Sequence, residues 1–243
     1  MTDRILRKNV VILFEGRCGS SHLTKLFDQR GDTRFEGEYL AEIQDRGWAA
    51  QRDWSASWFT RRFDGESEEA PVVMSGYKTK YRSVADIDAF GTHLAEHDVR
   101  VIRLYRESIF RQIVSAERAA HLNREHGIFN IEAGGADKAV GRIRIEEKAF
   151  RHWLHIFNEQ ERRIDDFIAR LPLPKISMSY EELTANKTAA LGRICDFVGL
   201  SYQDVPDYYA KHTPDDIASV VENYDELVAM AGGLRRSVAY ALS

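Results

Sequence analysis

Four apolar runs along the chain predict the strands of a buried sheet. The first, at 9–14, reads NVVILF and is rich in β-branched residues, with no polar residue alternating within it. A run of this kind is typical of a strand in a parallel sheet that is covered on both faces. Further strands are expected at 71–79, 99–105 and 175–179.

Between these runs, apolar residues recur at helical spacing. The pattern predicts helices at 22–29, 84–97, 109–124, 144–171 and 181–198. Pro172 and Pro174 follow the long fourth helix, and Gly199 is suited to close the fifth in a left-handed conformation. Because strands alternate with helices, we expect an α/β fold with a parallel sheet flanked by helices.

Two stretches show no clear period. Residues 31–70 are rich in Arg, Glu and Trp, and we expect short helices and loops there rather than core strands. Residues 125–141 contain several glycines and are interpreted as a lid insertion, too short to form a domain. Residues 1–243 are therefore expected to form a single domain.

A turn rich in glycine and serine, EGRCGSS at 15–21, joins the first strand to the first helix. Backbone N–H groups at a helix N-terminus are unpaired, and the helix dipole there favours negative charge. Ser20 and Ser21 add hydroxyl donors, and Arg17 adds a planar guanidinium suited to phosphate oxygens. The turn is a candidate anion site; the alternative is a tight turn in which serine caps the helix.

This turn does not fit the usual nucleoside-triphosphate loop. That motif, G-x-x-x-x-G-K-[ST], needs a lysine for the β- and γ-phosphates and a hydroxyl residue for Mg²⁺. Here Ser20 follows Gly19 directly, and the turn contains no lysine.

The segment RCGSS at 17–21 resembles the R-[ST]-G-[ST]-[ST] loop of sulfotransferases that use 3′-phosphoadenosine 5′-phosphosulfate (PAPS). Cys18 departs mildly from that pattern, where a small hydroxyl residue is usual. Further segments follow in the family's order: RLYRE at 103–107 with Ser115 downstream, then YEEL at 180–183 and FVGL at 197–200. Each is moderately specific, and the ordered set spans Val10 to Leu200. The fold implied is a P-loop-like parallel sheet.

The resemblance implies PAPS as co-substrate. It implies that the 5′-phosphosulfate is held by the loop and the helix start, namely Arg17, Cys18, Gly19, Ser20, Ser21 and His22. It implies that Arg106 and Ser115 hold the 3′-phosphate, together with Arg235 or Arg236 near the C-terminus. Independently, an arginine at the carboxyl end of a strand lies where α/β sheets bind ligands. The alternatives are that Arg106 pairs with Glu107, that Ser115 is a helix-surface serine, and that Arg235 and Arg236 belong to a solvated tail.

Sulfuryl transfer to a hydroxyl also needs a base for the acceptor proton. In bacterial and carbohydrate sulfotransferases a Gly-Glu pair after the first helix often supplies it, and FEGEYL at 35–40 is similar, which favours Glu38. Glu36 and Glu42 compete with it. Other family members use a histidine, for which the candidates are His93, His97, His121 and His126.

Lys78 ends the second predicted strand, and related enzymes have a Gly-x-Lys in such a place. It is expected to stabilise the leaving oxygen, with a surface lysine as the alternative. We expect Lys80 to point to the opposite face of the strand. Trp48, Trp54 and Trp58 follow Glu38; core packing is the first interpretation and acceptor binding the second.

Charge and composition narrow the partners. The net charge of −4, with both signs interspersed, gives no basic field for nucleic acid. Cys18 and Cys195 form no CxxC pair, and His152 and His155 lack accompanying carboxylates, so no metal site is expected. The apolar run after Val10 is too brief for a signal peptide, and no stretch is long enough to span a membrane. We expect a cytoplasmic protein with at most peripheral membrane contact.

These observations predict a PAPS-dependent sulfotransferase acting on a hydroxyl of a carbohydrate or glycolipid. Two alternatives stay open. One is a P-loop-like nucleotide or small-molecule kinase, and the other is a nucleotide-binding module without catalysis, which would keep Arg17 and Arg106 but need no base.

Overall fold

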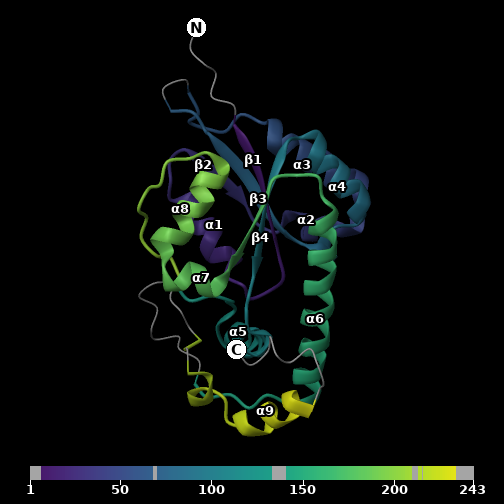
Figure 1. Ribbon diagram of the computed structural model, residues 1–243, viewed down its shortest axis with the longest axis vertical. Coiled ribbons are helices and arrows are strands. Elements are labelled where there is room, and N and C mark those ends of the chain that lie inside the picture. The colour runs from purple at the N-terminus through teal and green to yellow at the C-terminus, as the bar shows by residue number, and fades with distance from the viewer. Residues whose placement is uncertain (1–6, 68–69, 133–140, 210–212, 215, 234–243) are drawn as a thin grey trace.

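A computed structural model describes residues 7–67, 70–132, 141–209, 213–214 and 216–233. Five parallel strands form one sheet in the order β2-β3-β1-β4-β5 (Figure 1). They are β1 Lys8–Phe14, β2 Thr33–Glu36, β3 Met74–Lys80, β4 Val99–Tyr105 and β5 Lys175–Ser179.

The central strand β1 explains the continuous apolar run at 9–14. Val10, Ile12 and Phe14 pack into the core on one face of the sheet, and Val11 and Leu13 pack into the core on the other. Successive side chains of a strand point to opposite faces, so a strand covered on both sides must be apolar throughout.

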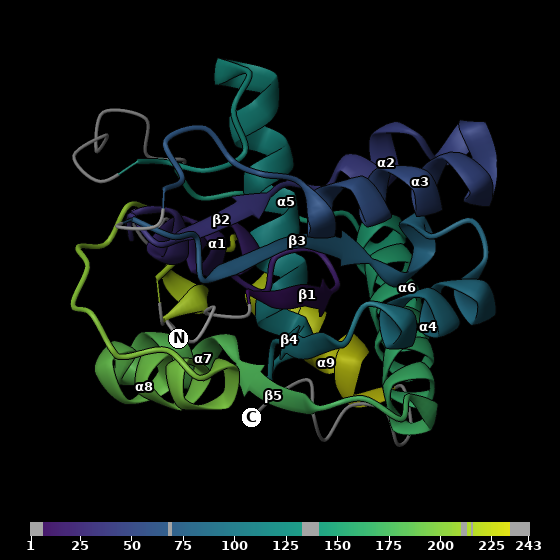
Figure 2. The ribbon, with the colours of Figure 1, turned by 90° about the horizontal axis from the view of Figure 1, so that it is seen from above.

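Helices cover both faces of the sheet (Figure 2). The first layer contains α1 Ser20–Asp28, α7 Tyr180–Ala185 and α8 Lys187–Val198. The second contains α3 Gly47–Thr60, α4 Ile87–Glu96 and the C-terminal part of α6 Glu147–Arg170.

A third core lies beyond the carboxyl ends of the strands. It joins α5 Ile109–His126, the N-terminal part of α6 and α9 Tyr224–Gly233 (Figure 1). Because α5 packs there, its N-terminal half forms a wall beside the strand ends. The described residues also form short helical turns: α2 Tyr39–Glu42, η1 Gln44–Arg46, η2 Tyr81–Ser83 and η4 Ile217–Ser219.

Most predicted elements are present, and the strands at 99–105 and 175–179 have the predicted limits. The prediction for 31–70 was wrong in part: the short helices α2 and η1 are present, but this stretch also holds the sheet strand β2 and the 14-residue helix α3. Strand β2 has only four residues, TRFE, too few for a period to be visible.

The helix predicted at 181–198 is two helices. Asn186 ends α7, and its side chain accepts a hydrogen bond from the Ala189 N–H at the start of α8. Gly199 closes α8 with a φ of 76°, as predicted. Of the proposed lid at 125–141, residues 133–140 lie outside the described residues, and the lid stays a prediction.

Within the described residues, no helix combines the length and the apolar character that a membrane crossing requires.

Candidate functional site

The site lies where the chain order of the sheet reverses. From β1 the chain goes outward to β2, returns to β3, and then crosses β1 to reach β4 and β5. Loops leaving β1 and β4 therefore diverge at the carboxyl edge and leave a crevice, which is where open α/β sheets bind ligands. Arg17 follows β1 and Arg106 follows β4.

The glycine loop presents the N-terminus of α1 to this crevice. Gly19 is the N-cap, in a left-handed conformation with φ of 81°, and no described side chain caps the helix. A Cβ at Gly19 would lie 2.5 Å from Cδ2 of Tyr180, so glycine is required both for its backbone and for this close approach. The serine cap considered as an alternative is not formed.

A cleft of about 310 Å³ opens at this edge. Seven of the residues expected to bind the cofactor line it: Arg17, Gly19, Ser20, Ser21, His22, Arg106 and Ser115. Cys18 does not. Its thiol is buried in the core, where burial raises its pKa to about 12, so only its backbone can face a ligand. Arg235 and Arg236 lie outside the described residues.

Arg17 crosses from the loop toward α5. Its Nε donates to Oγ of Ser115 at 3.3 Å, and its NH1 donates to the Phe129 carbonyl and to Oδ1 of Asn130, both at 3.3 Å. Its backbone has a φ of 68°, a conformation that is uncommon for a residue with a side chain. The loop thus holds this guanidinium against the start of the 125–141 insertion.

Arg106 lies beside Arg17 and is buried. Its Nε donates to Oε1 of Glu181 at 3.3 Å and its NH1 to the Arg17 carbonyl at 3.3 Å. Its guanidinium carbon stands 4.7 Å from the centre of the Tyr180 ring. The carboxylate partner is thus Glu181 on α7, and not Glu107, which had been weighed as the alternative.

Two guanidinium groups in one cleft, one half-buried and one buried, are electrostatically costly. Burial, and then the positive charge of Arg106, lowers the pKa of Arg17 to about 10, and burial also lowers the pKa of Arg106. Charged groups out of water favour a partner of opposite charge. Glu181 offsets part of this charge, and an anion in the cleft would offset more.

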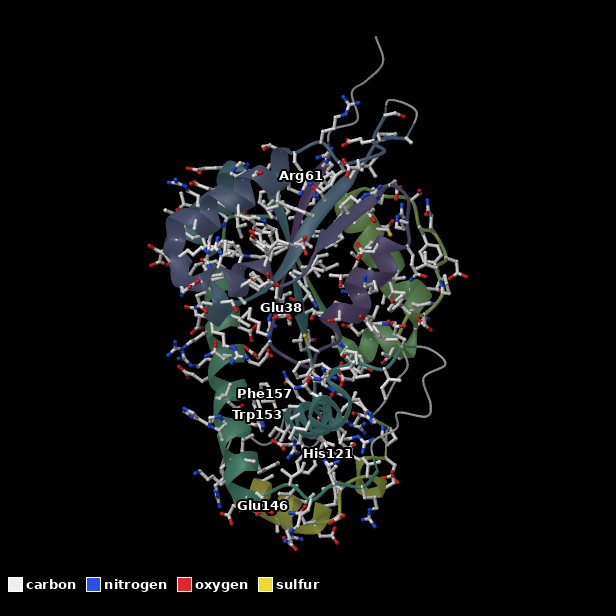
Figure 3. All side chains as sticks on the ribbon, turned by 180° about the vertical axis from the view of Figure 1, so that it is seen from behind. Glu38, Arg61, His121, Glu146, Trp153 and Phe157 are labelled. Carbon is white, nitrogen blue, oxygen red and sulfur yellow. The ribbon has the colours of Figure 1, made fainter. Side chains whose placement is uncertain are left out.

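On the other side of α1, Glu38 and two lysines form a second cluster. Lys78 Nζ donates to Oγ of Ser21 at 2.6 Å and lies 3.9 Å from Oε1 of Glu38. Lys80 Nζ lies 2.5 Å from Oε2 of the same carboxylate. Figure 3 shows Glu38 at the carboxyl end of the sheet. Ser21 thus links this cluster to the cleft, although neither Glu38 nor Lys78 lines the cleft itself.

The expectation that Lys80 points away from Lys78 was wrong. Residues two apart in a strand share a face, and both ammonium groups lie 5.6 Å from the centre of the Phe14 ring. Burial lowers the pKa of Lys78, and the neighbouring Glu38 carboxylate opposes that shift.

The histidines considered as bases are placed elsewhere. His93 is buried against Ser55 and meets the His97 ring edge-on, and His121 pairs with Glu125 on the surface of α5 (Figure 3). His126 ends α5 near the same carboxylate. None of the four lines the cleft.

The structure also shows the contacts of Glu36 and of the tryptophans that follow Glu38. The Glu36 carboxylate accepts from the neighbouring Gly37 N–H at 2.7 Å. Trp54 stacks on Tyr39 with ring centroids 4.7 Å apart, and it packs with Trp48 and Trp58 against the second core. The three tryptophans therefore serve mainly to pack the core, which was the first interpretation.

Several cleft residues were missed by the sequence interpretation. Tyr180 had been taken as structural, whereas it borders Gly19, Arg106 and the cleft. Asp207 lies 3.6 Å from His22 and 3.3 Å from Lys187, and Asn130 and Thr213 also line the cleft. Burial lowers the pKa of His22, partly opposed by Asp207. The YEEL motif gave a signal for Tyr180; the others lie in segments without a recognisable pattern.

Among the described residues, no group of three or more His, Cys, Asp or Glu side chains is arranged to hold a metal ion.

No protein-family model matches the chain, and no curated protein matches it. Among solved structures, a sulfotransferase domain from the curacin biosynthetic pathway matches with a TM-score of 0.50 and 15% identity, over 92% of this chain and 87% of that one. A sulfotransferase from Alicyclobacillus acidocaldarius matches with a TM-score of 0.47 and 16% identity, over 98% and 95%. At this identity the first likeness establishes the fold: a five-stranded parallel sheet flanked by helices, as in sulfotransferase domains.

Proposed function

We propose that the chain is a sulfotransferase that moves a sulfuryl group from PAPS to a hydroxyl of a carbohydrate or glycolipid. The observation that carries the proposal is the pair of arginines in one cleft at the N-terminus of α1, the half-buried Arg17 and the buried Arg106. A ligand with phosphates at two separate positions fits such a pair better than one with a single phosphate chain.

In this proposal the two ends of the donor use different groups. The phosphosulfate takes the N–H groups of the α1 N-terminus and the hydroxyls of Ser20 and Ser21. The 3′-phosphate takes Arg106 and Ser115, at the far wall of the cleft. Arg17, which contacts Ser115, lies between the two ends.

The transfer itself is a displacement at sulfur. The acceptor oxygen forms the new S–O bond, the bond from sulfur to the phosphate oxygen breaks, and Glu38 takes the hydroxyl proton. Lys78, bonded to Ser21 of the loop, offers positive charge to the departing phosphate oxygen. As in phosphoryl transfer, positioning and charge stabilisation supply most of the acceleration.

A carbohydrate acceptor is favoured by the aromatic side chains beside the base. Tyr39 directly follows Glu38, is only half-buried, and stacks on the half-buried Trp54. Aromatic faces of this kind suit the apolar face of a sugar ring.

The test is transfer of label from radiolabelled PAPS to a panel of oligosaccharide and glycolipid acceptors. Glu38→Gln keeps the size and removes the basicity, so turnover should fall by about 10²-fold or more while PAPS affinity holds. Glu36→Gln is the matched control and should leave turnover unchanged. Normal turnover of the Glu38 variant would remove Glu38 as the base. Absence of transfer, with ATP and Mg²⁺ binding tightly, would favour the kinase, and tight PAPS binding without transfer would favour a binding module.

A further inference from the structure

Lys78 and Lys80, at the end of β3, both lie near the Glu38 carboxylate, and their contacts differ. Lys78 donates to Ser21 of the glycine loop at 2.6 Å and stays 3.9 Å from Glu38. Lys80 contacts Glu38 at 2.5 Å. Lys78 is thus directed to the donor loop and Lys80 to the carboxylate.

The neighbouring strands fix this arrangement. Strand β2 runs parallel to β3 with Glu36 opposite Tyr77, so the chain after β2 passes the last residues of β3. The Phe14 ring, at the end of β1, lies 5.6 Å from both ammonium groups and separates them from the core. Glu38 therefore meets Lys80 as a consequence of strand register.

The Lys80–Glu38 ion pair is partly shielded from solvent. The side chains of Lys80 and Glu38 are 21% and 31% exposed, so water screens them less than a surface pair. An ammonium at this distance restricts the orientation of the carboxylate that it contacts.

Other charged groups lie near Glu38 or near its lysine partners. Lys78 comes from the same strand, and Arg17 of the glycine loop acts on Lys78. Arg82, which follows β3, turns to the buried Glu15 on the other side of β1, at 3.0 Å. Lys80 is therefore the cation in direct contact with the carboxylate.

We propose that Lys80 is a positioning residue that holds the Glu38 carboxylate in the orientation from which it reaches the acceptor hydroxyl. The inference rests on the proposed function, in which Glu38 is the base. Lys80 makes no bond to the donor or the acceptor; it acts through the carboxylate.

The first test does not depend on activity. Carbon-13 NMR of glutamate-labelled protein at pH 7 gives each carboxyl carbon a signal, and the signal lost in Glu38→Gln belongs to Glu38. In Lys80→Met that signal should move, because the carboxylate loses the contact that restricts its orientation, while Lys80→Arg should keep it close to that of the wild type. Lys148→Met, an exposed lysine on α6, is the matched control. An unchanged Glu38 signal in folded Lys80→Met overturns the inference.

The second test uses PAPS turnover with a chitooligosaccharide as the probe acceptor. Lys80→Met should lower kcat by about 10-fold with PAPS affinity unchanged, because the base is present but no longer held toward the acceptor, and Lys80→Arg should restore most of the turnover. In a Glu38→Gln background the Lys80 change should lower kcat no further, which separates this role from a general loss of structure. A normal kcat in Lys80→Met overturns the inference while leaving the proposed function standing. Normal turnover of Glu38→Gln overturns it through the base assignment instead.

Discussion

Arg106 is the residue on which donor selectivity depends in this account. It is buried at the carboxyl end of β4 and lines the cleft with Arg17. Arg106→Ala should weaken binding of adenosine 3′,5′-bisphosphate by about 10- to 100-fold, since a hydrogen bond to a charged group contributes roughly 1.5–3 kcal/mol. Binding of adenosine 5′-phosphate should change little. Titration calorimetry with both nucleotides measures the difference.

Arg100→Ala is the matched control, because Arg100 lies on the same strand at the opposite end and bonds to the Phe197 carbonyl. It should leave both affinities unchanged. Equal losses for the two nucleotides in Arg106→Ala would show that Arg106 does not distinguish them.

The buried side chain of His93 should make the free energy of unfolding depend on pH. It is 3% exposed, and its Nε2 lies 2.9 Å from Oγ of Ser55; burial, with the charges of His97 and Arg52, lowers its pKa to about 4. The folded pKa is below the unfolded value, so the unfolded chain binds the proton first. The stability that the neutral His93 contributes is fully present above about pH 6.5 and is lost as the pH falls toward 4. Between pH 7 and pH 5 the loss should be about 2 kcal/mol by urea unfolding.

His93→Gln should remove most of that pH dependence, whatever it does to stability at pH 7. The same change at the exposed His152 should leave the dependence intact. A His93→Gln protein with the full acid loss would assign the effect to other groups.

At the residue scale, the sequence predicted those site residues that lie together in a short motif or at a fixed spacing. Arg17, Ser20 and Ser21 lie in one short loop, and Arg106 and Ser115 lie at a fixed spacing, so all five could be found. Asp207 and Thr213 could not, because they reach the cleft from segments with no period of their own. The Lys80–Glu38 pair depends on two adjacent strands, one of which the sequence did not reveal.

The glycine loop is the element most sensitive to substitution. In Gly19→Ala the backbone would have to keep a φ of 81° with a Cβ 2.5 Å from the Tyr180 ring. A left-handed conformation alone costs roughly 1–2 kcal/mol for a residue with a side chain. We expect that loss in urea unfolding, and loss of nucleotide binding because the α1 N-terminus and Tyr180 must shift.

Gly192→Ala is a suitable control within a helix. Gly192 lies in α8, and a Cβ there meets no atom within 4 Å. Since alanine favours a helix by about 1 kcal/mol over glycine, stability should hold or rise. If Gly19→Ala binds nucleotide like wild type, the loop geometry is not what forms the anion site.

Strands could be predicted where nearly every residue is buried. They could not be predicted where the strand is short. The run at 9–14 is apolar throughout because β1 is central. Strand β2 is an edge strand of four residues with charged side chains, and only its pairing with β3 makes it a strand. The break at Asn186 was missed because the apolar period continues through it from α7 to α8.

At the scale of the whole molecule, the site is a product of topology. The sheet brings the ends of β1, β3 and β4 to one edge, and the third core holds α5 against that edge, where it contributes Ser115. Net charge is −4, so attraction to the donor must come from the cleft and not from the overall field. The class of fold could be predicted from the alternation of strands and helices; the placement of α5, α6 and α9 beyond the sheet could not.

The central claim is that this cleft recognises a nucleotide by its 3′-phosphate. Titration calorimetry of the wild-type protein with adenosine 3′,5′-bisphosphate, adenosine 5′-phosphate and ATP with Mg²⁺ tests it directly. The bisphosphate should bind about 100-fold or more tightly than adenosine 5′-phosphate, since two charged hydrogen bonds to the 3′-phosphate contribute roughly 3 kcal/mol or more. Equal affinity for the two adenosine phosphates, or preference for ATP with Mg²⁺, would contradict it.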